Sequence, residues 1–120
     1  MSKKRGARVA PPPRKGEWLL RFHDADAADG WEELCKQAPG PTRDAWDALT
    51  RNPRDRSNPS RQSQLRYDLA TRTIGGKQLE QWQYEVTGAG RIWYCPDDAS
   101  MTVFVTRASR AHPKETDGRR

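Results

Sequence analysis

Basic side chains with the chemistry to bind phosphate stand at two places late in the sequence. Arg91 opens the run Ile92-Trp93-Tyr94-Cys95, which is otherwise uncharged, and Arg110, His112 and Lys114 follow the last apolar run of the chain. Guanidinium and ammonium groups bind phosphate oxygens, and an imidazole can accept or donate a proton near neutral pH. These residues therefore predict a site for a phosphate-rich partner. The alternative is ordinary solvation of a basic tail.

The elements that position these residues are three predicted strands, at residues 81–87, 91–95 and 101–107. Each run is rich in β-branched and aromatic residues, and turn-forming clusters separate them, so consecutive antiparallel pairing is expected. In the first run apolar and polar residues alternate: Trp82, Tyr84 and Val86 against Gln81, Gln83 and Glu85. The second run is apolar on both faces apart from Arg91, which indicates a central strand covered on both sides.

Two helices are expected before this sheet, after a short strand at residues 18–22. Asp24 or Asp26 can cap the first helix, and the Ala38–Pro41 segment ends it. Gly30 inside this helix costs about 1 kcal/mol of helix propensity. Thr42 is predicted to cap the second helix, which runs to about Arg51. The residues predicted to be buried by the two helices are Ala27, Trp31, Leu34, Cys35, Ala45, Trp46 and Leu49.

The segments between the helices and the sheet are polar. Residues 52–63 predict a mobile loop. Leu65, Tyr67 and Leu69 then alternate with polar residues, and this segment could either start the sheet or link into it. Residues 74–77, Ile-Gly-Gly-Lys, predict a turn that brings Lys77 toward the sheet edge. The fold class expected from this order is α+β.

Composition limits the classes of protein that fit. The chain has 120 residues, of which 33% are hydrophobic, and its mean hydropathy is −1.10, which indicates one small domain with a modest core. No apolar run is long enough to cross a membrane, and the basic N-terminus lacks the apolar core of a signal peptide, so a cytoplasmic protein is expected. Cys35 and Cys95 lack the spacing of zinc ligands and are expected to be reduced thiols.

The net charge of +6 is unevenly distributed along the chain. Residues 1–16 hold six basic groups and no acid, together with three consecutive prolines, and predict a disordered or polyproline-like arm. Residues 17–50 hold eight acidic and three basic groups, whereas residues 51–120 hold thirteen basic and eight acidic groups. We therefore expect an arm at 1–16, a folded domain at 17–114 whose sheet side is basic, and a disordered tail at 115–120.

The order of strand, two helices and three-stranded antiparallel sheet resembles the RelE/ParE superfamily of bacterial toxins. The local likeness lies in the segments 82–86, 90–94 and 103–105, which read Trp-Gln-Tyr-Glu-Val, Gly-Arg-Ile-Trp-Tyr and Val-Phe-Val. The resemblance covers about residues 17–114 and implies a RelE-like fold with a sheet of three to four strands. It also implies a toxin of a type II toxin–antitoxin system.

RelE-type toxins cleave messenger RNA in the ribosome without metal. The RNA's 2′-hydroxyl attacks the adjacent phosphorus, so the protein supplies a base, cations for the transition state and an acid. By resemblance, Arg91 would bind the phosphate, His112 would act as acid or base, Lys77 would act on the 2′-hydroxyl or phosphate, and Glu85 could be a base. Arg110 and Lys114 would stabilise charge.

Several alternatives stay open for these residues. Arg91 could instead pair with Glu85 or Glu80 across the hairpin, and His112 could be merely exposed. Segment 109–114 lacks the aromatic residue on which several relatives stack a base, and Trp93, which shares a strand face with Arg91, could supply it.

At the level of function, the ParE branch inhibits DNA gyrase by protein contact, and a non-catalytic basic module that binds nucleic acid or protein is a further alternative. For a toxin, the resemblance implies messenger RNA and the ribosome as partners, and a cognate antitoxin, usually with a helix-turn-helix. It implies no cofactor.

Overall fold

The computed structural model describes residue 5 and residues 9–110. The three runs rich in β-branched and aromatic residues form three consecutive strands: β5 (Trp82–Glu85), β6 (Arg91–Asp97) and β7 (Thr102–Ser109). All three pair antiparallel, as the sequence predicted. Every residue of β6 is buried, and β6 is the middle strand of the main sheet.

The main sheet has five strands in the order β1-β7-β6-β5-β2. Strand β1 (Leu19–Phe22) lies parallel to β7 at one edge, and β2 (Gln62–Gln64) lies antiparallel to β5 at the other. The fold is α+β, as expected: β2, β5, β6 and β7 form an antiparallel sheet of four strands, within the predicted three to four, and the predicted first strand β1 is added in parallel at its edge. The position of β2 was not predicted, because its residues Gln-Ser-Gln carry no apolar alternation.

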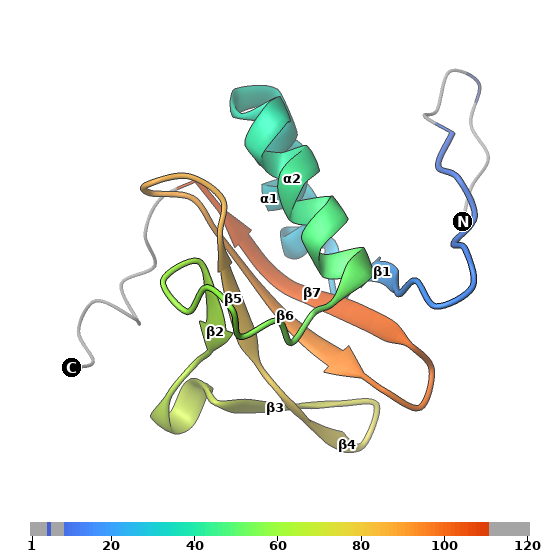
Figure 1. The fold of residues 1–120 in the computed structure, drawn as a ribbon, viewed down its shortest axis with the longest axis vertical. Helices are drawn as coiled ribbons and strands as arrows, with labels where there is room; N and C mark the ends of the chain where they lie inside the picture. The colour runs from blue at the N-terminus through green and yellow to red at the C-terminus, as the bar shows by residue number, and fades with distance from the viewer. Residues whose placement is uncertain (1–4, 6–8, 111–120) are drawn as a thin grey trace.

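A second, two-stranded sheet follows a short 3-10 helix at Tyr67–Leu69. Its strands are β3 (Thr71–Ile74) and β4 (Lys77–Glu80), joined by the predicted turn. Gly75 and Gly76 have φ angles of +59° and +82°, which glycine adopts without steric cost and which a two-residue hairpin requires. The hairpin lies at the end of the molecule opposite the helices (Figure 1).

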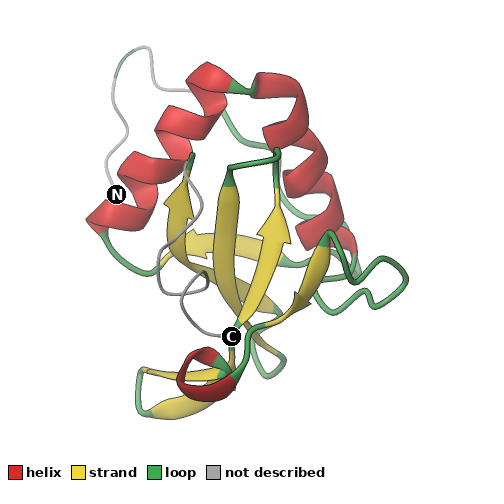
Figure 2. Ribbon diagram, turned by 90° about the vertical axis from the view of Figure 1, so that its left-hand side faces the viewer, coloured by secondary structure: helices red, strands yellow, loops and turns green. Residues whose placement is uncertain are grey.

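Both helices cover one face of the main sheet, and they meet at a short turn (Figure 2). Helix α1 (Ala25–Gln37) is capped by Asp24, whose carboxylate accepts a hydrogen bond from the amide of Ala27 at 2.9 Å. Helix α2 (Pro39–Arg51) starts directly afterwards. The Pro and Gly residues that end the first helix thus also begin the second, because proline fits the first helical turn.

The prediction that Thr42 caps the second helix was wrong. The helix begins three residues earlier, and Thr42 is buried inside it, where its hydroxyl donates to the carbonyl of Leu34 on α1 at 3.1 Å. The bond ties the two helices together by adding a second donor to a carbonyl that also accepts from the amide of Ala38 at 2.8 Å.

The core lies between the helices and the sheet. It contains four of the predicted helix residues and the Trp82, Tyr84 and Val86 face, and β6 and β7 complete it: Ala27, Leu34, Ala45, Leu49, Trp82, Tyr84, Val86, Ile92, Tyr94, Val103 and Val105. Trp31, Cys35 and Trp46, also predicted to be buried, are only half-buried. Helix α1 packs closely on β7, and a Cβ at Gly30 would lie 1.9 Å from the carbonyl oxygen of Ala108. Gly30 therefore allows the helix to touch the strand backbone, at the cost in propensity noted above.

Segment 52–61 is a loop, as predicted, but side chains fasten it to the sheet. The Tyr94 hydroxyl donates to the Pro53 carbonyl at 2.7 Å, and Arg54 donates to Glu80 at 3.0 Å and to Asp98 at 2.9 Å. The expectation of a mobile loop overlooked these anchors, since each partner lies more than 25 residues away in sequence.

Candidate functional site at one end of the sheet

The sheet face opposite the helices carries polar residues in two cross-strand rows. The first row joins Glu85, Arg91 and Ser109, which are register partners on β5, β6 and β7. The second row, two residues further along the strands, joins Gln83, Trp93 and Arg107. Because successive side chains point to opposite faces of a strand, both rows lie on one face.

Arg91 is buried, with 8% of its surface exposed. Its Nη1 donates to the carbonyls of Thr87, Gly88 and Gly90 at 3.0, 3.2 and 3.0 Å, so one nitrogen holds the whole β5–β6 hairpin turn. Its Nη2 lies 3.9 Å from Oε1 of Glu85. The interaction with Glu85 that the sequence left open as an alternative is therefore present, at long range.

The Nε of Arg91 is the buried side-chain nitrogen that lacks a hydrogen-bond partner within the described residues 5 and 9–110. A buried donor without an acceptor costs free energy, and such atoms often mark ligand or catalytic positions.

Glu85 is the accessible acid of this group, with 32% of its side chain exposed. Its backbone is held on both sides by Arg61 from the end of the 52–61 loop. The amide of Glu85 donates to the Arg61 carbonyl at 2.7 Å, and Nη1 of Arg61 donates to the Glu85 carbonyl at 2.9 Å. Arg61 was not among the residues singled out from the sequence, because it lies in a polar loop with no local signal of its position.

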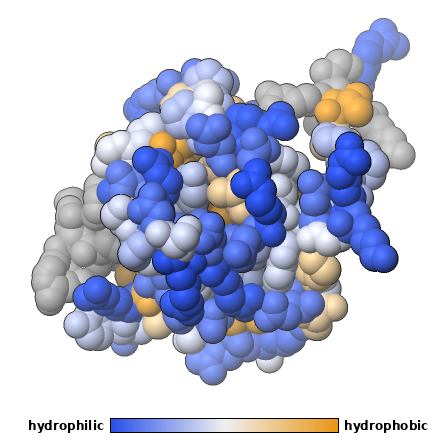
Figure 3. Space-filling view, in the orientation of Figure 1, coloured by the Kyte–Doolittle hydropathy of each residue, from blue (hydrophilic) through white to orange (hydrophobic). Residues whose placement is uncertain are grey.

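Arg110 is exposed and follows Ser109, the register partner of Arg91. The structure thus brings Arg61, Glu85, Arg91 and Arg110 to the same end of the sheet. His112 and Lys114 lie outside the described residues, as does the predicted tail at 115–120. Seen in the orientation of Figure 1, the surface is mostly hydrophilic, with small apolar areas between the polar side chains (Figure 3).

Lys77 is not brought into this cluster. Its Nζ donates to Oδ1 of Asp97 at 2.9 Å, which fastens the β3–β4 hairpin to the end of β6. Arg91 stands at the other end of that strand, six residues away, which corresponds to about 20 Å. The contact with Lys77 holds the pKa of Asp97 below its usual value.

Trp93 does not present an open ring for stacking. It is 4% exposed, its Nε1 donates to Oε1 of Gln83 at 2.9 Å, and the guanidinium of Arg107 lies 5.1 Å from the ring centroid. A nucleobase approaching this face would therefore meet the Arg107 guanidinium, which is itself planar and stacks on bases.

A second arginine lies over an indole at the other side of the sheet. Arg56, in the 52–61 loop, has its guanidinium carbon 5.0 Å from the ring centroid of Trp82. The Nε1 of Trp82 donates to Glu80, and this bond, followed by the one from Arg54, lowers the pKa of Glu80.

The described residues include no group of three or more His, Cys, Asp or Glu side chains that could hold a metal ion. Within them no helix is long and apolar enough to cross a membrane. Burial raises the pKa of the Cys95 thiol to about 12.

No protein-family model matches the chain, and the search of curated proteins found no match. A similar solved structure is that of a toxin–antitoxin complex. It is the RelBE2 complex from Mycobacterium tuberculosis, with 21% sequence identity and a TM-score of 0.48, covering 81% of this chain and 99% of that chain. A likeness of this size assigns no activity to the chain.

Proposed function

We propose that this protein is an RNA-cleaving toxin of the RelE type, with its active site at the end of the sheet formed by Glu85, Arg91, Arg61 and Arg110. The observation that carries the proposal is the half-exposed Glu85 carboxylate beside a buried arginine whose Nε has no hydrogen-bond partner among the residues that the structure describes. Arginines on the loop and on β7 add positive charge around that carboxylate. The sequence resemblance to RelE-type toxins supports the same reaction.

In the proposed reaction, Glu85 accepts the proton of the RNA 2′-hydroxyl, and the 2′-oxygen attacks the adjacent phosphorus. The bond from phosphorus to the 5′-oxygen breaks, which leaves a 2′,3′-cyclic phosphate and a 5′-hydroxyl after the leaving oxygen takes up a proton. Arg61 and Arg110 bind the phosphoryl oxygens, and the electrostatic stabilisation of the transition state comes chiefly from such cations. His112 is proposed as the acid, and Lys114 as a further phosphate contact.

Arg91 has a different role in this proposal from the one the sequence indicated. Its Nη1 donates to three carbonyls, so Arg91 holds the hairpin and the position of Glu85. Its Nε and Nη2 are the nitrogens left to contact the RNA. Lys77 and Trp93 act outside the reacting centre. Lys77 fixes the β3–β4 hairpin, and Trp93 supports Arg107 as a surface for RNA.

The messenger RNA would be cut on the ribosome, and a cognate antitoxin would restrain the toxin in the cell; both partners are part of the proposal. The test is inducible expression in a bacterial host, with growth recorded and messenger RNA 5′-ends mapped. The native chain is compared with Glu85→Gln and Arg110→Ala. Glu32→Gln, at an exposed acid on α1, is the matched control.

Growth arrest with new 5′-ends is expected for the native chain and for Glu32→Gln, and Glu85→Gln is expected to abolish both effects. Arrest without new 5′-ends would contradict RNA cleavage and favour a gyrase inhibitor.

A non-catalytic RNA-binding module is the second candidate, and one observation favours it. The Arg91 guanidinium donates through Nη1 to three hairpin carbonyls, so the cation that the sequence indicated for phosphate binding is largely used for structure. Salt-dependent binding of RNA by the purified chain, without cleavage by ribosome-bound or free protein and without growth arrest, would establish this candidate instead.

A further inference from the structure

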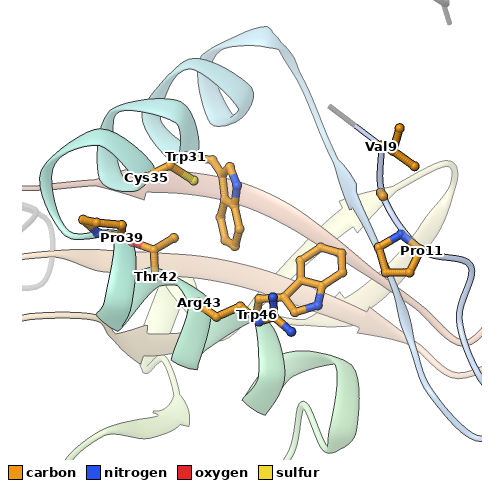
Figure 4. Close-up of a pocket in the computed structure, with 9 residues that line it drawn as sticks. Val9, Pro11, Trp31, Cys35, Pro39, Thr42, Arg43 and Trp46 are labelled. Carbon is orange, nitrogen blue, oxygen red and sulfur yellow. The ribbon is translucent and has the colours of Figure 1, made fainter. Parts of the chain in front are cut away.

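The outer side of the helical hairpin forms a groove that the functions considered above leave unused. The groove encloses a cavity of about 330 Å³ between α1, α2 and the N-terminal arm. Its walls are Trp31, Cys35, Pro39, Thr42, Arg43 and Trp46 on the helices and Val9, Ala10 and Pro11 on the arm. Figure 4 shows the two indoles between the helices, with Val9 and Pro11 on the far side of the space.

Trp31 and Trp46 line the groove, and the ring of Phe22 contacts Trp31 beside it. The ring centroids of Trp31 and Trp46 are 6.4 Å apart, and those of Phe22 and Trp31 are 6.3 Å apart, each pair with an interplanar angle of 61°. Both tryptophans are half-buried, and Phe22 is 45% exposed. Three large rings thus present an apolar surface that the core does not cover. Such surfaces are typical of sites that bind another segment of chain.

The arm is directed toward this groove by contacts of its own. A turn at residues 14–17 reverses the chain: the amide of Glu17 donates to the Arg14 carbonyl at 2.9 Å, and the Arg14 amide donates to the Glu17 carboxylate at 2.7 Å. The amide of Trp18 then donates to the carbonyl of Thr50, which fixes the start of the folded domain to the end of α2. Val9 is 90% exposed, so in the structure the arm forms one side of the groove and leaves the space unfilled.

We propose that this groove is a polyproline-binding site and that its occupant is the chain's own segment Val9–Pro13, which moves from the side of the groove onto Trp31 and Trp46. Proline-rich segments form a preorganised left-handed helix, and such helices dock on grooves lined by aromatic rings at a small cost in conformational entropy. Pro11, Pro12 and Pro13 supply that segment directly before the turn. Because the arm is tethered so closely, its effective concentration at the groove is high.

Charge supports the same occupant. The arm, residues 1–16, carries six basic groups and no acid, whereas residues 17–50, which include both helices, carry eight acidic and three basic groups. Arg43, the basic residue in the groove wall, pairs with Asp47 at 3.1 Å, so it does not oppose the arm as an isolated charge. This opposite charge favours docking of the arm on the helices, and high salt weakens the attraction. The inference is independent of any activity toward RNA.

The test uses the indole N–H signals of the five tryptophans in a ¹⁵N-labelled protein. The full chain is compared with the triple variant Pro11→Ser, Pro12→Ser, Pro13→Ser, which keeps the length and charge of the arm. The Trp31 and Trp46 signals are expected to shift between the two proteins. The Trp82 and Trp93 indoles, which donate to Glu80 and Gln83, should stay in place and report that the fold is intact.

A synthetic peptide of residues 5–16, added to the triple variant, is expected to return the Trp31 and Trp46 signals toward their positions in the full chain. High salt should move the full-chain signals toward those of the variant. Identical Trp31 and Trp46 signals in the two proteins, or no response to the peptide, would overturn the proposal. Signals that depend on protein concentration would assign the groove to a second copy of the chain and would overturn it as well.

Discussion

Arg91 and Glu85 are register partners on adjacent strands, yet Nη2 of the arginine lies 3.9 Å from Oε1 of the glutamate. The pair is this far apart because Nη1 of Arg91 donates to carbonyls of the hairpin that joins the two strands. The side chain that the sequence marked most clearly for chemistry is thus also the one that shapes the turn. This double use means that a loss of activity in an Arg91 variant must be separated from a loss of structure.

Replacing Arg91 with Lys should lower the free energy of unfolding by roughly 1–3 kcal/mol, since an ammonium cannot reproduce the buried, multiply bonded guanidinium. Urea denaturation measures the change. Arg110→Lys, at an exposed position, serves as the control and should leave stability within about 0.5 kcal/mol. Unchanged stability in Arg91→Lys would remove the structural role and return Arg91 to the catalytic candidates.

Substituting Gly30 by Ala should destabilise the protein by about 1–3 kcal/mol, even though alanine is the better helix former. The added methyl would lie 1.9 Å from the Ala108 carbonyl oxygen, so α1 must move away from β7. Gly40→Ala, on the other helix, meets nothing within 4 Å beyond its chain neighbours. Its stability should change by less than about 1 kcal/mol, because Pro41 restricts the residue before it and opposes the gain in helix propensity. Thermal unfolding should therefore shift clearly in Gly30→Ala alone, and equal shifts would contradict the close packing.

The Tyr94 hydroxyl should contribute about 1–3 kcal/mol to the free energy of unfolding, because it anchors the 52–61 loop. It donates to the Pro53 carbonyl and accepts from Nε2 of Gln62 at 3.0 Å, and burial raises the pKa of the phenol. In Tyr94→Phe both partners lose this bond in a buried site. The matched variant Tyr67→Phe, at a residue that is 70% exposed, should be neutral. Equal stability of the two variants would show that the loop is anchored elsewhere.

Acid should unfold the protein partly through Glu80 and Asp97. Hydrogen bonds from Trp82 and then Arg54 hold the pKa of Glu80 below its usual 4.5, and Lys77 holds that of Asp97 below its usual 3.8. Because the folded-state pKa values are depressed, the stability is fully present above the usual values and is lost as pH falls through the folded ones. Chemical denaturation from about pH 5 to about pH 2 should show this fall.

Glu80→Gln should flatten that fall in the range below 4.5, since the amide does not titrate. Glu32→Gln, at an exposed carboxylate on α1, is the control and should keep the native pH dependence. An unchanged profile in Glu80→Gln would show that the Trp82 and Arg54 contacts carry little of the acid sensitivity.

Periodicity was sufficient to predict strands β5, β6 and β7, both helices and most of the core. Trp82, Tyr84 and Val86 form the core face because a two-residue alternation permits only one face to be buried. The boundary between the helices was less predictable: Thr42 has the chemistry of a cap, but proline fits the first turn as well, and the buried bond to Leu34 decided where Thr42 lies.

The sequence by itself determined the α+β class, the antiparallel strands, the charge segregation between the arm, the helices and the sheet, and the candidacy of Glu85, Arg91 and Arg110. Only the tertiary structure decided that Arg61 joins them, that Lys77 lies at the other end of β6, and that Arg107 covers Trp93. The physical reason is sequence distance. Local patterns fix which face of an element is buried, whereas the meeting of side chains from a loop, a hairpin and a terminal strand depends on pairing register and packing between segments far apart in the chain.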